Sequence, residues 1–216
     1  MEYLIKDLFE NRAGISAVIA CIDEAAEDKT LLFKPSLWVE EALQIGDTFG
    51  EERMEALCAT AQYCQVLTRA EGLLANSDYS RNRLVYRLMR FGFPREVCER
   101  AADTMVEKGY IREREQALRT ARFYCKVKHW GKKRIAVELM GRGYGREAVR
   151  HALNAVTEEE YFAALMKLVD QKYPRPSADE KERQKRIAAL VRMGYSYSEI
   201  ERVFEMKHVL FEEETQ

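Results

Sequence analysis

The chemistry-bearing residues of this chain are cations gathered between residues 112 and 150. This segment holds twelve Lys and Arg residues against four Asp and Glu residues, a net charge of +8, although the whole chain carries −1. Such a density of cations suits the phosphates of nucleic acid or an acidic protein surface. It is also found on the solvated face of a helix, and the residues leave both interpretations open. The candidate contact residues are Arg119, Arg122, Lys126, Lys128, Trp130, Lys132, Lys133, Arg134, Arg142, Arg146 and Arg150.

The spacing of these cations predicts helical faces. Arg142, Arg146 and Arg150 recur every four residues, which stacks them on one side of a helix. Phe123, Tyr124 and Trp130 lie among the cations. Such aromatic rings either stack on nucleobases or belong to the core between helices, and the sequence alone leaves both possibilities open.

Other kinds of site find no support in the residue pattern. The chain has no glycine-rich phosphate loop, no HExxH, no CxxC and no GxSxG, so we expect no catalytic residues and no cofactor. The three histidines, far apart in sequence, are expected to be surface or structural residues rather than metal ligands. Five cysteines, an odd number without ligand spacing, favour reduced thiols. The longest apolar run, Ile15–Ile22, is too short for a membrane span and follows no signal peptide, and with the reduced thiols this favours the cytoplasm. We also expect a monomer.

The elements that must position these cations repeat three times with a period of 51 residues. Laid on one another, the copies match without a gap at a leucine, a glycine four residues later and the aromatic residue that follows. The matched positions are Leu88, Gly92, Phe93, Leu139, Gly143, Tyr144, Leu190, Gly194 and Tyr195. A constant spacing of this kind indicates a repeat architecture. A glycine after a helix adopts the left-handed conformation at no steric cost, so each copy predicts a helix, a tight turn and a second helix.

The remaining residues of each period leave room for one more helix. The predicted fold is therefore mainly α, a tandem array of three three-helix repeats preceded by a small α/β segment. We expect an acidic cap at 1–54, repeats at 55–109, 110–156 and 157–206, and a frayed acidic tail at 207–216. The cap contributes to a net charge of −8 over residues 1–60, the opposite of the second repeat.

Local signals refine this outline. Residues 15–23 and 30–33 predict a β-hairpin, residues 36–43 a short helix and residues 45–47 a turn, whereas 1–10 fits a strand or a helix. Three S/T-x-x-E patterns predict capping boxes, at Thr157 with Glu160, Ser177 with Glu180 and Ser196 with Glu199. Asp78 or Ser80 is expected to cap the second helix of the first repeat.

With the repeats aligned, the chain resembles the RecX family, regulators of the bacterial recombinase RecA. Residues 80–111 (SRNRLVYRLMRFGFPREVCERAADTMVEKGYI) look like the first repeat of that family. Residues 121–145 (ARFYCKVKHWGKKRIAVELMGRGYG) look like the second, and 186–204 (RIAALVRMGYSYSEIERVF) like the third. The likeness covers about residues 40–206.

The resemblance implies an all-helical, non-enzymatic protein that lodges in the groove of the RecA–DNA filament. There it would suppress strand exchange, ATP hydrolysis and coprotease activity, in DNA repair and the SOS response. Several family members also bind single- or double-stranded DNA. The leading candidates for the contact are Lys126, Lys132, Lys133, Arg134 and Arg142. The alternatives are a stand-alone nucleic-acid-binding module that uses the basic face of the second repeat, and a scaffold whose helices dock another protein.

Overall fold

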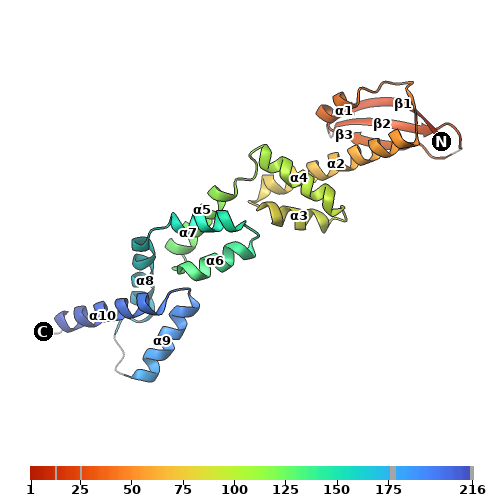
Figure 1. Cartoon of the computed structure of the whole chain (residues 1–216). Helices are drawn as coiled ribbons and strands as arrows, with labels where there is room; N and C mark the ends of the chain where they lie inside the picture. The colour runs from red at the N-terminus through yellow and green to blue at the C-terminus, as the bar shows by residue number, and fades with distance from the viewer. Residues whose placement is uncertain (13, 25, 176–178, 215–216) are drawn as a thin grey trace. The chain divides into compact units, whose positions relative to one another are not determined.

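The computed structural model describes residues 1–12, 14–24, 26–175 and 179–214, with the backbone alone for 209–214. The chain divides into two compact units, the first made of Met1–Tyr79 and Leu84–Tyr110, the second of Ser80–Arg83 and Ile111–Gln216. Figure 1 labels their helices and strands.

The first unit begins with an antiparallel sheet in the order β3-β2-β1-β4. Its strands are β1 (Glu2–Asn11), β2 (Gly14–Cys21), β3 (Lys29–Phe33) and β4 (Thr48–Gly50). The predicted hairpin is confirmed as β2 and β3, which pair antiparallel. Residues 1–10, left open between strand and helix, form β1. The short strand β4, which no sequence signal indicated, pairs with the start of β1.

Two helices cover this sheet and extend the first unit. The predicted short helix is α1 (Pro35–Glu41). The long helix α2 (Glu51–Asn76) begins directly after β4. Ile5, Ile19 and Phe33 of the sheet share one buried core with Leu57 and Cys64 of α2. The first half of α2 therefore packs on the sheet, because its apolar residues recur at helical spacing on one face.

The first repeat is completed by α3 (Arg81–Met89) and α4 (Arg95–Glu107). Tyr63 on α2 hydrogen-bonds to the Thr104 hydroxyl at 2.7 Å, and the guanidinium of Arg100 lies 3.7 Å from its ring centre. Leu88 on α3 and Cys98 on α4 are fully buried. The helix α2 is thus shared between the sheet and the first repeat.

The second unit holds the other two repeats. The second repeat consists of α5 (Glu113–Lys126), α6 (Lys132–Gly141) and α7 (Arg146–Asn154), and the third of α8 (Glu158–Lys172), α9 (Glu180–Arg192) and α10 (Tyr197–Glu214). Each repeat has its own buried cluster, built around Ile135 and Leu139 in the second and around Leu165, Leu190 and Ile200 in the third. The prediction of three repeats of three helices is confirmed.

The repeated glycines end the second helix of each repeat as predicted. Gly92, Gly143 and Gly194 have positive φ angles of 88°, 81° and 97°. In the second repeat the Tyr144 N–H donates to the Leu139 carbonyl at 3.2 Å. The equivalent Tyr195 N–H donates to the Leu190 carbonyl at 3.4 Å. These bonds form the Schellman motif, which favours glycine for its left-handed conformation and is frequently accompanied by an apolar contact between the residues at the leucine and aromatic positions.

One contact inside the second unit recurs after 51 residues. The Oγ of Ser80, just before α3, donates to the Arg142 carbonyl at 2.7 Å. The N–H of Gly131, just before α6, donates to the Met193 carbonyl at 2.8 Å. In both cases the start of a second helix rests on the turn of the following repeat. This contact holds the second and third repeats together within the second unit.

The third repeat departs from the pattern at the start of its second helix. The position equivalent to the first residue of α3 and α6 is Arg183, but α9 begins three residues earlier, at Glu180. Its N-cap is Asp179, whose side chain accepts from the Lys181 N–H at 3.0 Å. The capping box expected at Ser177 falls on residues 176–178, which lie outside the described part of the chain.

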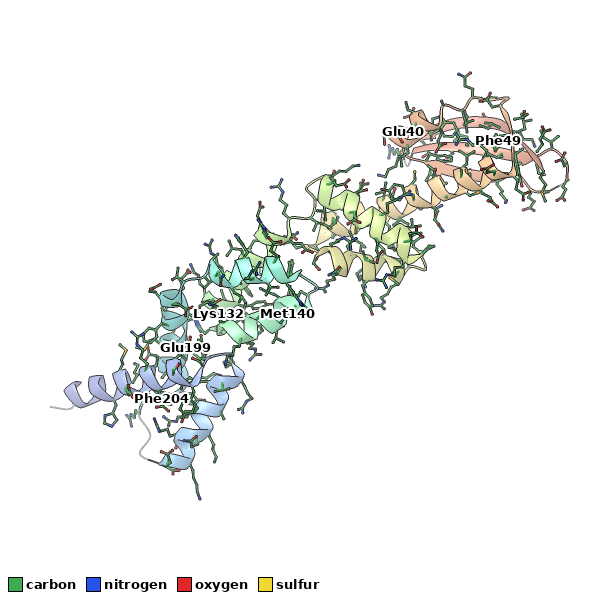
Figure 2. All side chains as sticks on the ribbon, viewed as in Figure 1. Glu40, Phe49, Lys132, Met140, Glu199 and Phe204 are labelled. Atoms are coloured by element: carbon green, nitrogen blue, oxygen red, sulfur yellow. The ribbon has the colours of Figure 1, made fainter. Side chains whose placement is uncertain are left out.

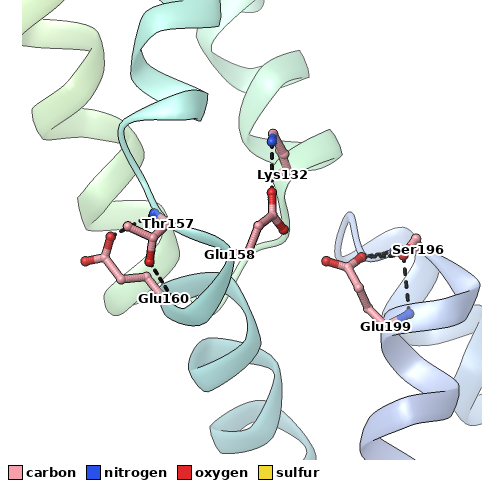
Figure 3. A network of polar contacts seen from close by, with 6 residues as sticks. All are labelled: Lys132, Thr157, Glu158, Glu160, Ser196 and Glu199. Atoms are coloured by element: carbon pink, nitrogen blue, oxygen red, sulfur yellow. Dashed lines mark hydrogen bonds and ion pairs between the residues drawn. The ribbon is translucent and has the colours of Figure 1, made fainter.

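The other predicted caps are confirmed. Ser80 accepts from the Arg83 N–H at 3.3 Å and so caps α3. Thr157 and Glu160 form a capping box at the start of α8, and Ser196 and Glu199 make the same reciprocal bonds before α10 (Figure 3). The expected frayed tail is wrong as far as Glu214, because α10 continues to that residue. Its last turns contain neither glycine nor proline, so nothing in the sequence ends the helix earlier.

Candidate functional site

The predicted basic segment becomes α5, α6 and α7 and the short connections between them. The structure divides its eleven candidate residues into three sets according to what each side chain contacts. One set is built into an aromatic stack, a second is paired with carboxylates of α8, and a third is exposed.

The stack consists of two aromatic rings between two guanidinium groups. The rings of Tyr124 and Trp130 lie 4.5 Å apart and nearly parallel, at 12°. The Arg134 guanidinium lies 4.1 Å from the centre of the Trp130 ring, and the Arg142 guanidinium 5.4 Å from that of Tyr124. The Tyr124 ring and the Arg134 guanidinium are both so close to the centre of the Trp130 ring that they would collide if they lay on the same face of it. They therefore occupy its two opposite faces. Such cation–π contacts stabilise the protein most when they are partly desolvated.

Hydrogen bonds fix the ends of this stack. Arg142 donates to Glu138 at 3.1 Å and to the Tyr124 hydroxyl. Arg134 donates to the Met193 sulfur, in the turn of the third repeat, at 3.0 Å. Burial, reinforced by the Glu138 carboxylate and opposed by the Arg142 charge, raises the pKa of Tyr124, so its hydroxyl stays protonated at neutral pH. Arg134, Arg142 and Trp130 are therefore structural residues first.

Two predicted lysines are paired with the acidic first turn of α8. Lys126 lies 3.0 Å from Glu160, and Lys132 lies 3.1 Å from Glu158 (Figure 3). The hydrogen bond from Lys126, followed by that from the Thr157 N–H, holds the pKa of Glu160 below its usual value. At least one partner of each pair is more than half exposed, so each pair contributes little to stability. An anionic partner can therefore replace the carboxylate at small cost.

The remaining candidates are exposed. Within the described residues, the side chains of five of them make no hydrogen bond or ion pair: Arg122, Lys128, Lys133, Arg146 and Arg150. Arg119 is exposed as well but has a contact of its own. Phe123, the most exposed aromatic residue of the segment at 47%, lies edge-on to Tyr124. These side chains can meet a phosphate or a carboxylate without breaking any internal contact.

Sequence reasoning missed the residues that hold the cations in place. The sequence indicates Glu160 only as part of a capping box, and it singles out neither Glu158 nor Met193. The signal that was available is the run of three glutamates opening α8, which follows directly on the basic repeat. Its pairing with Lys126 and Lys132 depends on the angle between helices, which the spacing of residues along the chain does not give.

The other candidate chemistries find no geometry among the described residues. No three His, Cys, Asp or Glu side chains in that part of the chain are close enough to hold a metal ion. None of its helices is both long enough and apolar enough to cross a bilayer. His129 contributes its carbonyl, which accepts from the Tyr195 hydroxyl at 3.0 Å. Burial raises the pKa of the Cys125 thiol to about 11, which leaves it unreactive at neutral pH.

Comparison with known proteins gives a consistent result. The family model described as "RecX, third three-helix domain" matches residues 158–204, which are the third repeat. The chain is 24% identical to the regulatory protein RecX of Clostridioides difficile (strain 630), over 74% of this chain and 76% of that protein. It is 23% identical to the regulatory protein RecX of Clostridium tetani (strain Massachusetts / E88), over 82% of this chain and 83% of that one.

Solved structures share the fold. A crystal structure of regulatory protein RecX superposes with a TM-score of 0.78 at 17% identity, over 94% of this chain and 99% of that chain. The crystal structure of RecX from Lactobacillus salivarius gives a TM-score of 0.61 at 16% identity, over 68% of this chain and 97% of that chain. At these identities the likeness shows the fold, and the predicted helical repeat array is confirmed.

Proposed function

We propose that this chain is a RecX-type regulator that binds the filament that RecA forms on DNA. It inhibits recombinase, ATPase and coprotease activity there, in DNA repair and the SOS response. The match of its third repeat to a RecX domain and its likeness to RecX proteins support the proposal. The regulator is a cytoplasmic monomer and acts by binding alone, without catalysis or cofactor.

The observation that carries the proposal is the set of exposed cations on the second repeat. A nucleoprotein filament is strongly anionic, and Lys133, Arg146 and Arg150 have no internal partner among the described residues to lose on binding it. Lys126 and Lys132 join them when the filament displaces Glu160 and Glu158. Several repeats bound along one filament raise the effective concentration of each contact, so modest contacts add up to tight binding. A bound array blocks the subunit movements and the DNA exchange that the filament requires.

The test is the ATPase activity of RecA on single-stranded DNA with this protein titrated in. We expect inhibition by the natural protein and at least tenfold weaker inhibition by Lys133→Glu/Arg146→Glu/Arg150→Glu, because three phosphate or carboxylate contacts become repulsive. The matched control is Arg12→Glu/Lys29→Glu/Lys108→Glu, three exposed cations of the first unit with the same change of charge. An absence of inhibition by the natural protein would sink the proposal. If both variants lost inhibition equally, the effect would depend on the net charge of the protein and not on the position of the three cations.

A second function is favoured by the exposed Phe123 beside these cations. We propose as the alternative a stand-alone nucleic-acid-binding module that uses the basic face of the second repeat on single- or double-stranded DNA. It predicts that the protein binds DNA in the absence of recombinase and that its affinity for DNA falls steeply with salt concentration. The same charge-reversed variant then loses DNA binding, and Phe123→Ala weakens binding to single strands more than to duplex, because only unpaired bases offer a face to the ring.

A further inference from the structure

The second helix of every repeat exposes a pair of apolar residues at the same two positions. The pairs are Tyr86 and Met89 on α3, Val137 and Met140 on α6, and Ala188 and Val191 on α9, with members exactly in register at the 51-residue period. All six side chains are exposed, including Val137 at 67% and Met140 at 51%. Figure 2 labels Met140 on α6. Because the two members of a pair are three residues apart, they lie on the same face of the helix.

The inward face of the same helices shows that this exposure is not a consequence of loose packing. The leucine between the two positions of each pair is buried, with no more than 1% of its surface exposed. These leucines are Leu88, Leu139 and Leu190. A single exposed apolar residue is ordinary on a protein surface. The recurrence of an exposed pair at three equivalent positions indicates a surface with one purpose, used once per repeat.

Cations outnumber carboxylates along the part of each helix that carries the pair. Helix α3 carries three arginines and no carboxylate, and α6 carries three cations against Glu138. The stretch of α9 from Lys185 to Arg192, which holds the third pair, has three cations and no carboxylate. The complement of this surface is acidic with an apolar centre. Phosphates alone offer nothing to Val137 and Met140, so the partner surface is protein rather than nucleic acid.

We propose that the second helix of each repeat docks on a polymer of identical protein subunits, its exposed pair entering an apolar pocket with an acidic rim on one subunit. The inference rests on the proposed function, which supplies such a polymer, and adds the surface that meets it. Three equivalent helices suit a partner that presents one surface repeatedly, because each repeat then makes the same contact. The cations of α5 and α7 remain available for the DNA that the polymer encloses.

The experiment measures binding to RecA filaments on single-stranded DNA for polar variants of each pair. The variants are Tyr86→Gln/Met89→Gln, Val137→Gln/Met140→Gln and Val191→Gln, and their folding is checked by circular dichroism. Glutamine keeps the helix and replaces only exposed surface. The control is Val127→Gln, which is 57% exposed but lies at the end of α5, outside the second helices. Binding to single-stranded DNA without recombinase and the mass of the free protein in solution are measured for each variant.

We expect each of the two double variants to weaken filament binding by roughly tenfold, the effect of leaving two side chains in water, and the single variant Val191→Gln to weaken it less. All three variants are expected to leave DNA binding unchanged. The control binds as the natural protein does. If the natural protein binds and all three variants bind equally well, the inference is wrong while the proposed function stands. If the natural protein does not bind the filament, the proposed function itself fails. A concentration-dependent dimer that the variants abolish would assign the pairs to contacts between copies of this chain and overturn the proposal.

Discussion

Gly131 and Gly194 lie backbone against backbone where the second repeat meets the third. A Cβ atom on Gly131 would stand 2.5 Å from the carbonyl carbon of Gly194, and one on Gly194 would stand 2.5 Å from the Arg134 nitrogen. The hydrogen bond from the Gly131 N–H to Met193 draws the two segments together. The junction therefore has room for no side chain on either residue, although the two glycines have different conformations.

The first prediction concerns this close approach. Gly131→Ala is expected to lower the free energy of unfolding of the second unit by about 1–3 kcal/mol, because the backbone of the third repeat must move away. The matched control is Gly141→Ala in the same helix, where an added Cβ meets nothing within 4 Å. Removing a glycine from a helix favours folding, so the control gains up to about 1 kcal/mol. Urea unfolding measures both, and equal effects would refute the role of the junction.

The second prediction concerns the acidic first turn of α8. Glu158→Gln releases Lys132 and is expected to change the free energy of unfolding by less than about 0.5 kcal/mol, because the pair is exposed. The freed lysine adds one contact, so the salt dependence of binding to an anionic partner steepens by about one unit in log–log slope. Glu159→Gln makes the same change of charge one residue along without releasing Lys132, and its slope is expected to stay that of the natural protein. A salt titration with both variants decides whether Lys132, once released from Glu158, contacts the anionic partner.

The repeat period explains why so much of the fold was predictable. Leu139, Gly143 and Tyr144 lie at one hydrogen-bonded helix end, and the left-handed conformation there favours glycine, so a chain that repeats this helix end shows a regularly spaced glycine. The sheet was only partly foreseen, because β4 is three residues long and becomes a strand through pairing with β1, a contact between distant segments.

The basic segment was recognisable in the sequence as a group of cations, but the contact that each cation makes was not. The charge of the segment marked the second repeat correctly as its most basic part. Spacing did not distinguish Lys133, which is exposed, from its neighbour Arg134, which stacks on Trp130. That difference depends on where the turn of the third repeat lies, which is a tertiary contact.

The third prediction concerns Trp130, whose ring was a candidate for stacking on nucleobases. Since Tyr124 and Arg134 occupy both of its faces, we expect single-stranded DNA to leave its fluorescence nearly unchanged. The other tryptophan, Trp38, is removed as Trp38→Phe so that the emission comes from Trp130 alone. Strong quenching on addition of an oligonucleotide that is shown to bind would mean that Arg134 leaves the ring and a base takes its place.

Two buried tyrosines give the second unit a dependence on alkaline pH. Burial, the main cause, raises the pKa of Tyr161 and of Tyr195 well above the ordinary value for a tyrosine. The Tyr195 hydroxyl donates to the His129 carbonyl at 3.0 Å, whereas that of Tyr161 is buried without a partner among the described residues. The two side chains are both within 1% of complete burial, so they form a matched pair that differs in one hydrogen bond.

The fourth prediction follows from that difference. Both hydroxyls stay protonated in the native state, whereas the tyrosines of the unfolded chain ionise near pH 10. The native state therefore holds more protons above about pH 10, so the free energy of unfolding falls as the pH rises. The decrease is roughly 1.4 kcal/mol per pH unit for each tyrosine. Either Tyr→Phe variant removes one tyrosine and flattens this decline. At pH 7, Tyr195→Phe is expected to cost about 1 kcal/mol for its lost hydrogen bond, while Tyr161→Phe is neutral or stabilising because it removes an unpaired buried hydroxyl. Urea unfolding between pH 7 and 11 tests both parts. A Tyr161→Phe protein as unstable at pH 7 as Tyr195→Phe would show that the Tyr161 hydroxyl has a partner after all.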